Sequence, residues 1–281
     1  MKTCLVLEGG GLRGIYTAGV LDALYRENIK IDAIIGVSMG TIVGINYISK
    51  QPGRALRYNL KYAHDKRYIG INQYLKTGDI VNKKFAYHDI PEKLDKFDYH
   101  TYEKSNIKLY CTVTNVKTGK AEYKQIKNAK EQIEYLRAGA SLPGVSKIVK
   151  INGKKYLDGG IADPIPVNKA ISLGYDKIIV ITTRPIDYRK RKTPINPLGL
   201  MYHMYPKFVV AINRRANKYN KTVEQIQQLE KENKIFVIRP SKKINIKRIE
   251  KNDRTITLQY NLGKEDFKNK KNDLIKYLKT E

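Results

Sequence analysis

The stretches LVLEGGGLRG at residues 5–14 and AIIGVSMG at residues 33–40 decide the fold of this chain. In each of them a short apolar run ends at glycines and is followed by a helical pattern of apolar residues. The elements expected here are strands over 3–8 and 31–36 and helices over 14–26 and 38–49. A strand, a glycine turn and a helix, repeated at short spacing, predict a parallel sheet with helices on its faces.

Further elements are expected along the rest of the chain. They are strands over 107–113, 121–126, 177–183 and 235–239, a hairpin over 147–157, and helices over 130–140, 203–219, 221–233 and 265–279. Residues 50–105 are polar, with scattered Tyr and Lys, and predict loops and short helices that can form a cap over a site. The basic, proline-bearing stretch 184–197 is the expected boundary between a catalytic domain over 3–185 and a basic C-terminal extension over 186–281. We expect that extension to pack on the catalytic domain or to continue it.

The charge is strongly positive, at +27 over 281 residues. Residues 184–281 hold 25 Lys and Arg against 10 Asp and Glu, so the excess per residue is greatest in the last third. Such a surface favours anionic partners, namely acidic lipid headgroups, phosphorylated substrates or nucleic acid. The alternative is a compositional preference for Lys, Asn, Ile and Tyr that reflects no ligand at all.

Composition also bears on location and on metals. Apolar residues make up 41% of the chain, and no run of them reaches the roughly 18 residues of a membrane span. The apolar run at the N-terminus is too short for a signal peptide, so we expect a cytoplasmic protein, with peripheral contact at the inner face of the membrane. Cys4 and Cys111 lie in strand-like runs and have no metal-ligand spacing, so we expect buried free thiols and no metal site.

The turn at 36–40 has the pattern of a nucleophile elbow. In G-x-S-x-G the two glycines let the backbone crowd around a serine on a sharp strand-to-helix turn, which makes Ser38 a candidate nucleophile. The plainer alternative is a serine that only caps the following helix. The pattern is weak by itself, and its place between a predicted strand and a predicted helix strengthens it.

The glycine loop at 9–14 has two interpretations. Gly9, Gly11 and Gly14 match the G-x-G-x-x-G dinucleotide fingerprint, and the row of backbone N–H groups also suits an oxyanion hole. A dinucleotide site expects an acidic residue after the second strand, where this chain has the Ser38 elbow. A Walker loop needs Gly-Lys-Ser/Thr, which does not follow. We therefore expect an oxyanion hole and no cofactor.

The serine requires a base. None of the four histidines lies in a recognisable motif, whereas Asp158 directly follows a predicted strand in the triplet Asp158-Gly159-Gly160. A carboxylate within hydrogen-bond reach of a hydroxyl can act as its general base. The structural alternative for Asp158 is an Asx turn with glycines.

These motifs, in this order, resemble those of the patatin-like phospholipases. GGGLRG, GVSMG and DGG agree with the family in order and approximate spacing, as do ASLPG at 140–144 and DPIPV at 163–167, and the resemblance covers residues 3 to about 185. It implies a three-layer α/β/α fold around a mostly parallel sheet. It also implies hydrolysis of lipid acyl esters through an acyl-enzyme, by a Ser-Asp dyad without histidine and without a metal or other cofactor.

Carried over by motif, the resemblance assigns roles to residues of this chain. Ser38 is the implied nucleophile and Asp158 the implied general base. Backbone N–H groups of Gly10 and Gly11 would bind the oxyanion, with Arg13 in support. The remaining motif glycines are Gly9, Gly14, Gly36, Gly40, Gly159 and Gly160.

Other functions remain open from the sequence. Ser38, Asp158 and His203 occur in the chain order of a Ser-His-Asp α/β-hydrolase. A basic protein that binds nucleic acid or membrane without catalysis is compatible with the charge, although no nucleic-acid-binding motif is present. An inactive patatin-like scaffold is a third alternative. We expect a lipid acyl-ester substrate and no specific nucleic acid, and the sequence does not indicate the oligomeric state.

Overall fold

A single eight-stranded sheet forms the centre of the protein. The computed structural model describes residues 1–191 and 197–280. The strand order is β5-β6-β3-β2-β1-β7-β8, with β4 also paired to β3. The strands are β1 (Thr3–Leu7), β2 (Ala33–Val37), β3 (Lys108–Asn115), β4 (Ala121–Ile126), β5 (Val149–Ile151), β6 (Lys154–Asp158), β7 (Lys177–Ile181) and β8 (Phe236–Ile238). β3, β2, β1, β7 and β8 run parallel, whereas β4, β5 and β6 pair antiparallel at one side. The predicted mostly parallel sheet is confirmed.

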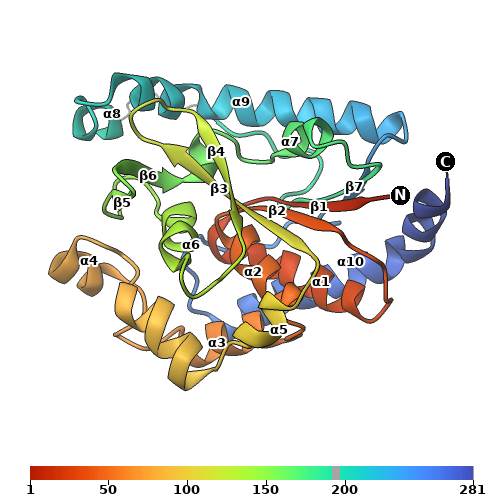
Figure 1. Ribbon diagram of the computed structural model, residues 1–281, viewed down its shortest axis with the longest axis horizontal. Coiled ribbons are helices and arrows are strands. Elements are labelled where there is room, and N and C mark those ends of the chain that lie inside the picture. The colour runs from red at the N-terminus through yellow and green to blue at the C-terminus, as the bar shows by residue number, and fades with distance from the viewer. Residues whose placement is uncertain (192–196, 281) are drawn as a thin grey trace.

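Helices cover both faces of this sheet, as Figure 1 shows. The helices are α1 (Ile15–Tyr25), α2 (Met39–Ile48), α3 (Arg54–Tyr62), α4 (Ile71–Thr77), α5 (Tyr99–Glu103), α6 (Ile133–Ala140), α7 (Val167–Ser172), α8 (Pro197–Met201), α9 (Pro206–Lys231) and α10 (Asp253–Lys279). α7 and α9 lie on one face, and α1, α2 and α10 lie on the other. This is the predicted three-layer α/β/α arrangement.

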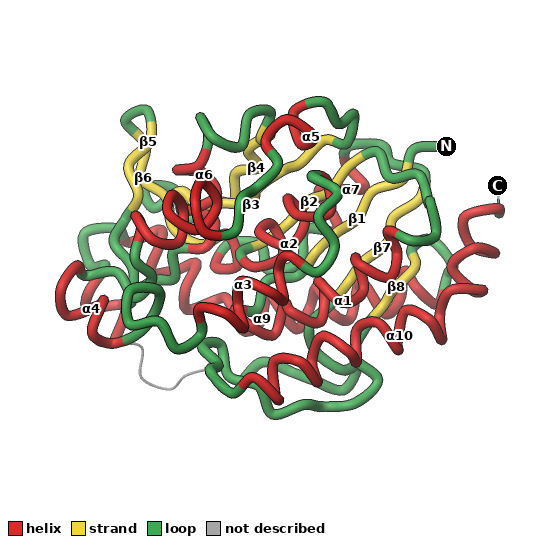
Figure 2. Tube along the Cα trace, turned by 90° about the horizontal axis from the view of Figure 1, so that it is seen from below, coloured by secondary structure: helices red, strands yellow, loops and turns green. Residues whose placement is uncertain are grey.

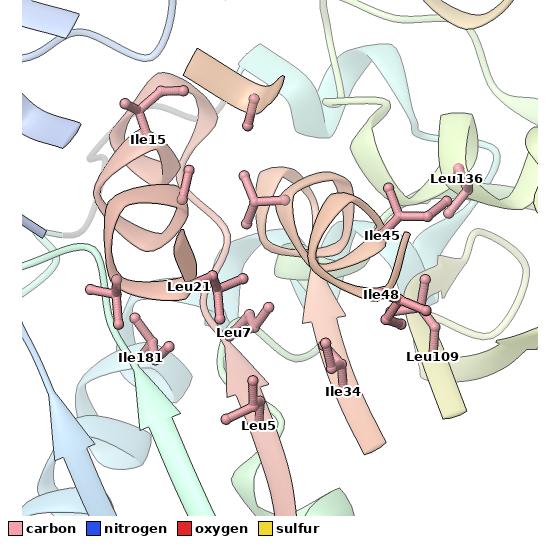
Figure 3. Packing of buried hydrophobic residues seen from close by; sticks show 14 of the residues in the cluster. Leu5, Leu7, Ile15, Leu21, Ile34, Ile45, Ile48, Leu109, Leu136 and Ile181 are labelled. Carbon is pink, nitrogen blue, oxygen red and sulfur yellow. The ribbon is translucent and has the colours of Figure 1, made fainter. Parts of the chain in front are cut away.

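Side-chain alternation along the central strand builds the two cores. Leu5 and Leu7 of β1 point to the α1 and α2 side, and Cys4 and Val6 point to the α7 and α9 side. All five residues of β1 are buried, as expected for a parallel strand covered on both faces. Figure 3 shows the first of these cores, where Leu5, Leu7 and Ile34 pack under the two helices. The two cysteines are buried free thiols, as predicted.

The C-terminal third joins this structure through both β8 and α10. β8 pairs parallel with β7 and so extends the sheet. α10 lies along α1 in Figure 2, and two glycines bring the helices close together. A Cβ atom added at Gly19 would lie 2.0 Å from the carbonyl oxygen of Tyr260, and one added at Gly263 would lie 2.1 Å from that of Tyr16. Only glycine fits at this crossing.

Three of the predicted helices differ from the structure. The helices expected over 203–219 and 221–233 form one helix, α9, because no glycine or proline interrupts the chain near residue 220. α10 begins well before the expected residue 265, at an N-cap where the Asn252 side chain accepts a hydrogen bond from Thr255 N–H at 2.9 Å. The prediction began that helix after Gly263, but this glycine lies inside α10, at the crossing with α1.

Residues 50–105 form short helices and loops, as predicted. The helices of this region are α3, α4 and α5, and the π-helical segment Phe85–Leu94, which contains Pro91, lies between α4 and α5. One buried carboxylate ties this segment together. Asp95 contacts Arg54 at 3.1 Å and accepts two hydrogen bonds from Arg57, at 2.7 and 2.9 Å. The predicted hairpin is also present, with Asn152 and Gly153 at positive φ in its turn.

Candidate active site

Ser38 stands between the end of β2 and the first residue of α2. Its backbone has φ 53° and ψ −125°, a left-handed φ that a serine adopts only when its surroundings hold it there. Its side chain caps no helix N–H, so the capping alternative does not account for it. A Cβ at Gly36 would lie 2.6 Å from the backbone nitrogen of Thr41, and one at Gly40 would lie 2.6 Å from the carbonyl oxygen of Leu7. The two motif glycines therefore permit the sharp turn.

The glycine loop lies beside this serine. A Cβ at Gly9 would lie 3.0 Å from the Cβ of Ser38, so the loop and the elbow are in direct contact. Gly11 has φ +58° and begins the 3₁₀ turn Gly11–Gly14. N–H groups at the start of such a turn have no acceptor within it, and they are available to an anion. Leu12 N–H is already used, since it donates to the carbonyl oxygen of Arg248 at 2.9 Å.

Asp158 ends β6 and is 2% exposed. Its Oδ1 accepts a hydrogen bond from Gly160 N–H at 2.7 Å, which is the Asx turn expected as the structural alternative. Its Oδ2 is buried and has no hydrogen-bond partner among the described residues. Burial raises the pKa of Asp158 above its usual value, against the opposing effects of the Ser38 hydroxyl, the Arg215 guanidinium and Gly160 N–H. Oδ1 therefore stabilises the turn, whereas Oδ2 is available to accept a proton.

Two cavities meet at Ser38. The larger, of about 200 Å³, is lined mainly by apolar side chains of α2, of residues 54–99 and of α6. The smaller, of about 90 Å³, is polar, and Glu8, Asp158, Arg13, Arg184, Lys190, Arg215 and Arg248 are among its lining residues. The serine thus has an apolar space on one side and a charged space on the other.

The histidines lie away from both cavities. His203 is exposed in the turn between α8 and α9, rather than in the expected helix, and its Nδ1 lies 2.9 Å from the Leu200 carbonyl oxygen. None of the four histidines lines either cavity. Within the described residues, no group of three or more His, Cys, Asp or Glu could hold a metal ion. Asp158, whose pKa the Ser38 hydroxyl lowers, therefore remains the candidate base.

Sequence reasoning missed the contribution of the C-terminal third to this site. Lys190, Arg215 and Arg248 line the smaller cavity, and Arg215 Nε donates to the Gly160 carbonyl oxygen at 2.8 Å. It also missed Glu8, a buried carboxylate that accepts hydrogen bonds from Thr183 N–H at 2.5 Å and from the Tyr219 hydroxyl at 2.9 Å. The positive charge of residues 184–281 was the available signal, but it did not indicate which cations face the serine.

Comparison with known proteins places the chain in a family. The patatin-like phospholipase model matches residues 5–171, and the chain belongs to that family. A second model, of a domain family of unknown function (DUF6363), matches residues 205–279. No helix in the described part of the chain is long and apolar enough to cross a membrane.

Several curated proteins share the patatin-like region. The uncharacterized protein YjjU of Escherichia coli is 28% identical over 198 residues, which are 66% of this chain and 52% of YjjU. The lysophospholipase nte1 of Aspergillus niger is 30% identical over 194 residues, 65% of this chain and 12% of that protein. The lysophospholipase NTE1 of Scheffersomyces stipitis is 31% identical over 198 residues, 68% and 12% respectively. The chain thus spans about half of one relative and a small part of the others.

Proposed function

We propose that this protein hydrolyses acyl esters of lipids through an acyl-enzyme, with Ser38 as nucleophile and Asp158 as general base. The observation that carries the proposal is the buried, unpartnered Oδ2 of Asp158, a carboxylate close enough to the Ser38 hydroxyl for that hydroxyl to lower its pKa. Membership of the patatin-like phospholipases and similarity to proteins named lysophospholipases support a lipid substrate.

The proposed reaction has two steps on the same groups. Ser38 Oγ attacks the ester carbonyl carbon while Asp158 accepts the hydroxyl proton, and that proton then passes to the departing alcohol. Water next attacks the acyl-enzyme, with Asp158 again as base. A carboxylate of raised pKa holds a proton more readily at neutral pH than an ordinary aspartate does, which suits both transfers.

The negative charge that develops on the carbonyl oxygen would be met by the N–H groups of Gly10 and Gly11. The Leu12–Arg248 backbone hydrogen bond and the crowding of Gly11 against Arg248 hold the loop in its shape. Donors that are fixed in advance stabilise such an anion most, and loss of one donor costs about 10²–10³ in rate in comparable sites. Arg13 adds positive charge from the same turn.

The larger cavity would take the acyl chain. Its wall includes Met39, Ile42 and Ile45 of α2 on one side, and Tyr58 and Ile90 from residues 50–105 on the other. Residues 50–105, which the sequence predicted to be able to form a cap over a site, would thus cover the acyl chain.

We also propose that the protein meets the membrane through one end. The exposed large apolar side chains include Ile71 and Leu75 of α4 and Leu200, Met201 and Met204 in and after α8. α4 and α8 lie at the same end of the molecule (Figure 1). Gly144 joins the two regions, because its carbonyl oxygen accepts from Tyr74 at 3.2 Å and its N–H donates to Tyr202 at 3.0 Å. Leu142, in the same loop, lines both cavities, so this end would face the lipid.

We further propose that residues 186–281 continue the catalytic domain rather than form a separate one. The pairing of β8 with β7 and the close packing of α10 on α1 support this view. The Arg248 carbonyl, which holds the glycine loop, supports it as well.

The proposal is tested with a fluorophosphonate probe, which labels activated serines. Wild type should be labelled and should hydrolyse a short uncharged ester, whereas Ser38→Ala and Asp158→Asn should do neither. His203→Ala is the control and should behave as wild type. Labelling of Ser38→Ala equal to wild type would contradict the nucleophile assignment. Loss of activity in His203→Ala would instead favour a histidine triad.

A further inference from the structure

The smaller cavity beside Ser38 gathers positive charge from distant parts of the chain. Arg13 comes from the glycine loop, Arg184 and Lys190 follow β7, Arg215 belongs to α9, and Arg248 precedes α10. Four of these cations are half-buried, and Arg248 is exposed at the rim. Cations that are up to about 230 residues apart in the sequence therefore line one cavity, instead of being scattered over a basic surface.

Among the described lining residues, two carboxylates face these five cations and offset only part of their charge. Glu8 acts on Arg13 and Lys190, and Asp158 acts on Arg215. Glu8 and Asp158 are the acidic side chains in the cavity lining, and each is held by other hydrogen bonds. The ion pairs within 4.0 Å among the described residues include none of the five cations. The Nε of Arg13 is buried and has no hydrogen-bond partner among those residues. The cavity therefore holds five cations against two carboxylates, together with a buried donor that has no acceptor among the described residues.

Without a bound anion, this arrangement disfavours the charged forms of the cations. Burial, and then repulsion from Arg184 and Arg248, lowers the pKa of Arg13 to about 10. Burial, and then repulsion from Arg215 and Arg248, lowers the pKa of Lys190 to about 7. A bound anion would reverse these effects, because it favours the charged form of every cation around it.

Aromatic rings and backbone contacts hold the cations toward the cavity. The Arg184 guanidinium lies 4.4 Å from the ring centre of Tyr188, and Lys190 Nζ lies 5.1 Å from that of Tyr219. The backbone of Lys190 is fixed by two hydrogen bonds to the Asn220 side chain, at 2.8 and 3.1 Å. Arg184 and Lys190 are thus held in place before any ligand arrives, which reduces the cost of binding.

We propose that this cavity binds a phosphate group, and that the cations supplied by the C-terminal third, Lys190, Arg215 and Arg248, are the residues that make the site prefer an acyl ester whose alcohol part carries a phosphate. This inference rests on the proposed function for the reaction itself, but not for the binding. The acyl chain would enter the apolar cavity on one side of Ser38, and the phosphate would lie among the cations on the other. Arginine forks match the oxygens of phosphate in pairs, and several of them together exceed what a single carboxylate can engage.

Binding is tested first, without catalysis, in the Ser38→Ala protein. Calorimetric titration with sn-glycerol 3-phosphate and with inorganic phosphate should show binding of at least one of them. Lys190→Met and Arg248→Met, each made in that background, should weaken it by about 10-fold or more. Lys243→Met is the matched control. Like Lys190 and Arg248, Lys243 is a cation of residues 186–281, but it is exposed and does not line the cavity. Equal weakening by Lys243→Met, or no binding at all, would overturn the proposal.

The source of the phosphate is tested next, by activity. The ratio of kcat/KM for 1-oleoyl lysophosphatidate to that for 1-monooleoylglycerol should fall about 10-fold in Lys190→Met and in Arg248→Met. A fall in this ratio assigns the site to the substrate headgroup. An unchanged ratio, together with binding of inorganic phosphate lost in both variants, assigns it to free phosphate. Phosphate binding in a protein that hydrolyses neither ester would refute the proposed function and leave the phosphate site intact.

Discussion

The crossing of α1 and α10 gives a stability prediction whose sign differs from the usual rule. Replacing a glycine by alanine inside a helix normally stabilises it by about 1 kcal/mol, because alanine has the higher helix propensity. At Gly19 the added Cβ would lie 2.0 Å from the carbonyl oxygen of Tyr260, far inside the 3.4 Å at which ordinary contact begins. We therefore expect Gly19→Ala to destabilise the protein.

The magnitude follows from the two opposing effects. Overpacking a tight interface costs about 1–3 kcal/mol, and a clash with rigid backbone belongs at the upper end of that range. Subtracting about 1 kcal/mol for helix propensity leaves a loss of about 2 kcal/mol. For a protein of this size such a loss lowers Tm by about 4–8 °C.

The assay is thermal and urea unfolding followed by circular dichroism, with Gly199→Ala as the matched control. Gly199 lies in α8, and a Cβ there would meet only Val209 Cγ1, at an ordinary 3.6 Å. The control should keep or raise Tm. If Gly19→Ala proved as stable as Gly199→Ala, the close approach of α1 to α10 would not exist in solution.

Three further predictions concern the proposed acyl-chain cover, the proposed base and the proposed membrane face. Asp95→Ala leaves two arginines without their shared carboxylate and should cost about 3 kcal/mol in the free energy of unfolding; no change in the urea midpoint would contradict this. Burial raises the pKa of Asp158, and the base must be deprotonated, so kcat/KM for an uncharged ester should fall on acidification with a midpoint above the ordinary value of about 3.9. A midpoint at or below 3.9 in the pH–rate profile would show that burial does not dominate. Leu200→Asp should weaken co-sedimentation with phosphatidylglycerol vesicles, whereas Leu258→Asp, at an exposed leucine of α10, should not; equal effects would argue against the proposed face.

Local sequence patterns predicted the sheet, its main helices and its turns, because these features depend on residues that are close together in the sequence. The elbow at Ser38 and the hairpin turn at Asn152 each depend on a few adjacent residues whose backbone requirements are visible in the residue types. The alternation that buries β1 on both faces is equally local. The last helix was predicted over 265–279, whereas α10 begins at Asp253 and contains Gly263, a residue type that normally weakens a helix but is needed here for a contact with a distant one.

The electrostatic half of the site could not be predicted in the same way. Arg248 reaches the glycine loop, and Arg215 reaches Gly160, only after distant parts of the chain have folded together, and no periodicity encodes either approach. The same holds for Asp158 Oδ2, since its lack of a partner is a property of the packed interior. Composition showed that cations were abundant, whereas the fold determines which of them face the serine.

The hydrogen bond between Leu12 and Arg248 also has a consequence for the order in which the chain is made. Ser38 and the glycine loop leave the ribosome early, but the carbonyl that holds the loop is synthesised much later. We therefore expect ribosome-bound chains stalled before residue 248 to resist the fluorophosphonate probe, and full labelling of such chains would contradict this. An incompletely synthesised chain would then be inactive toward the lipids of the cell.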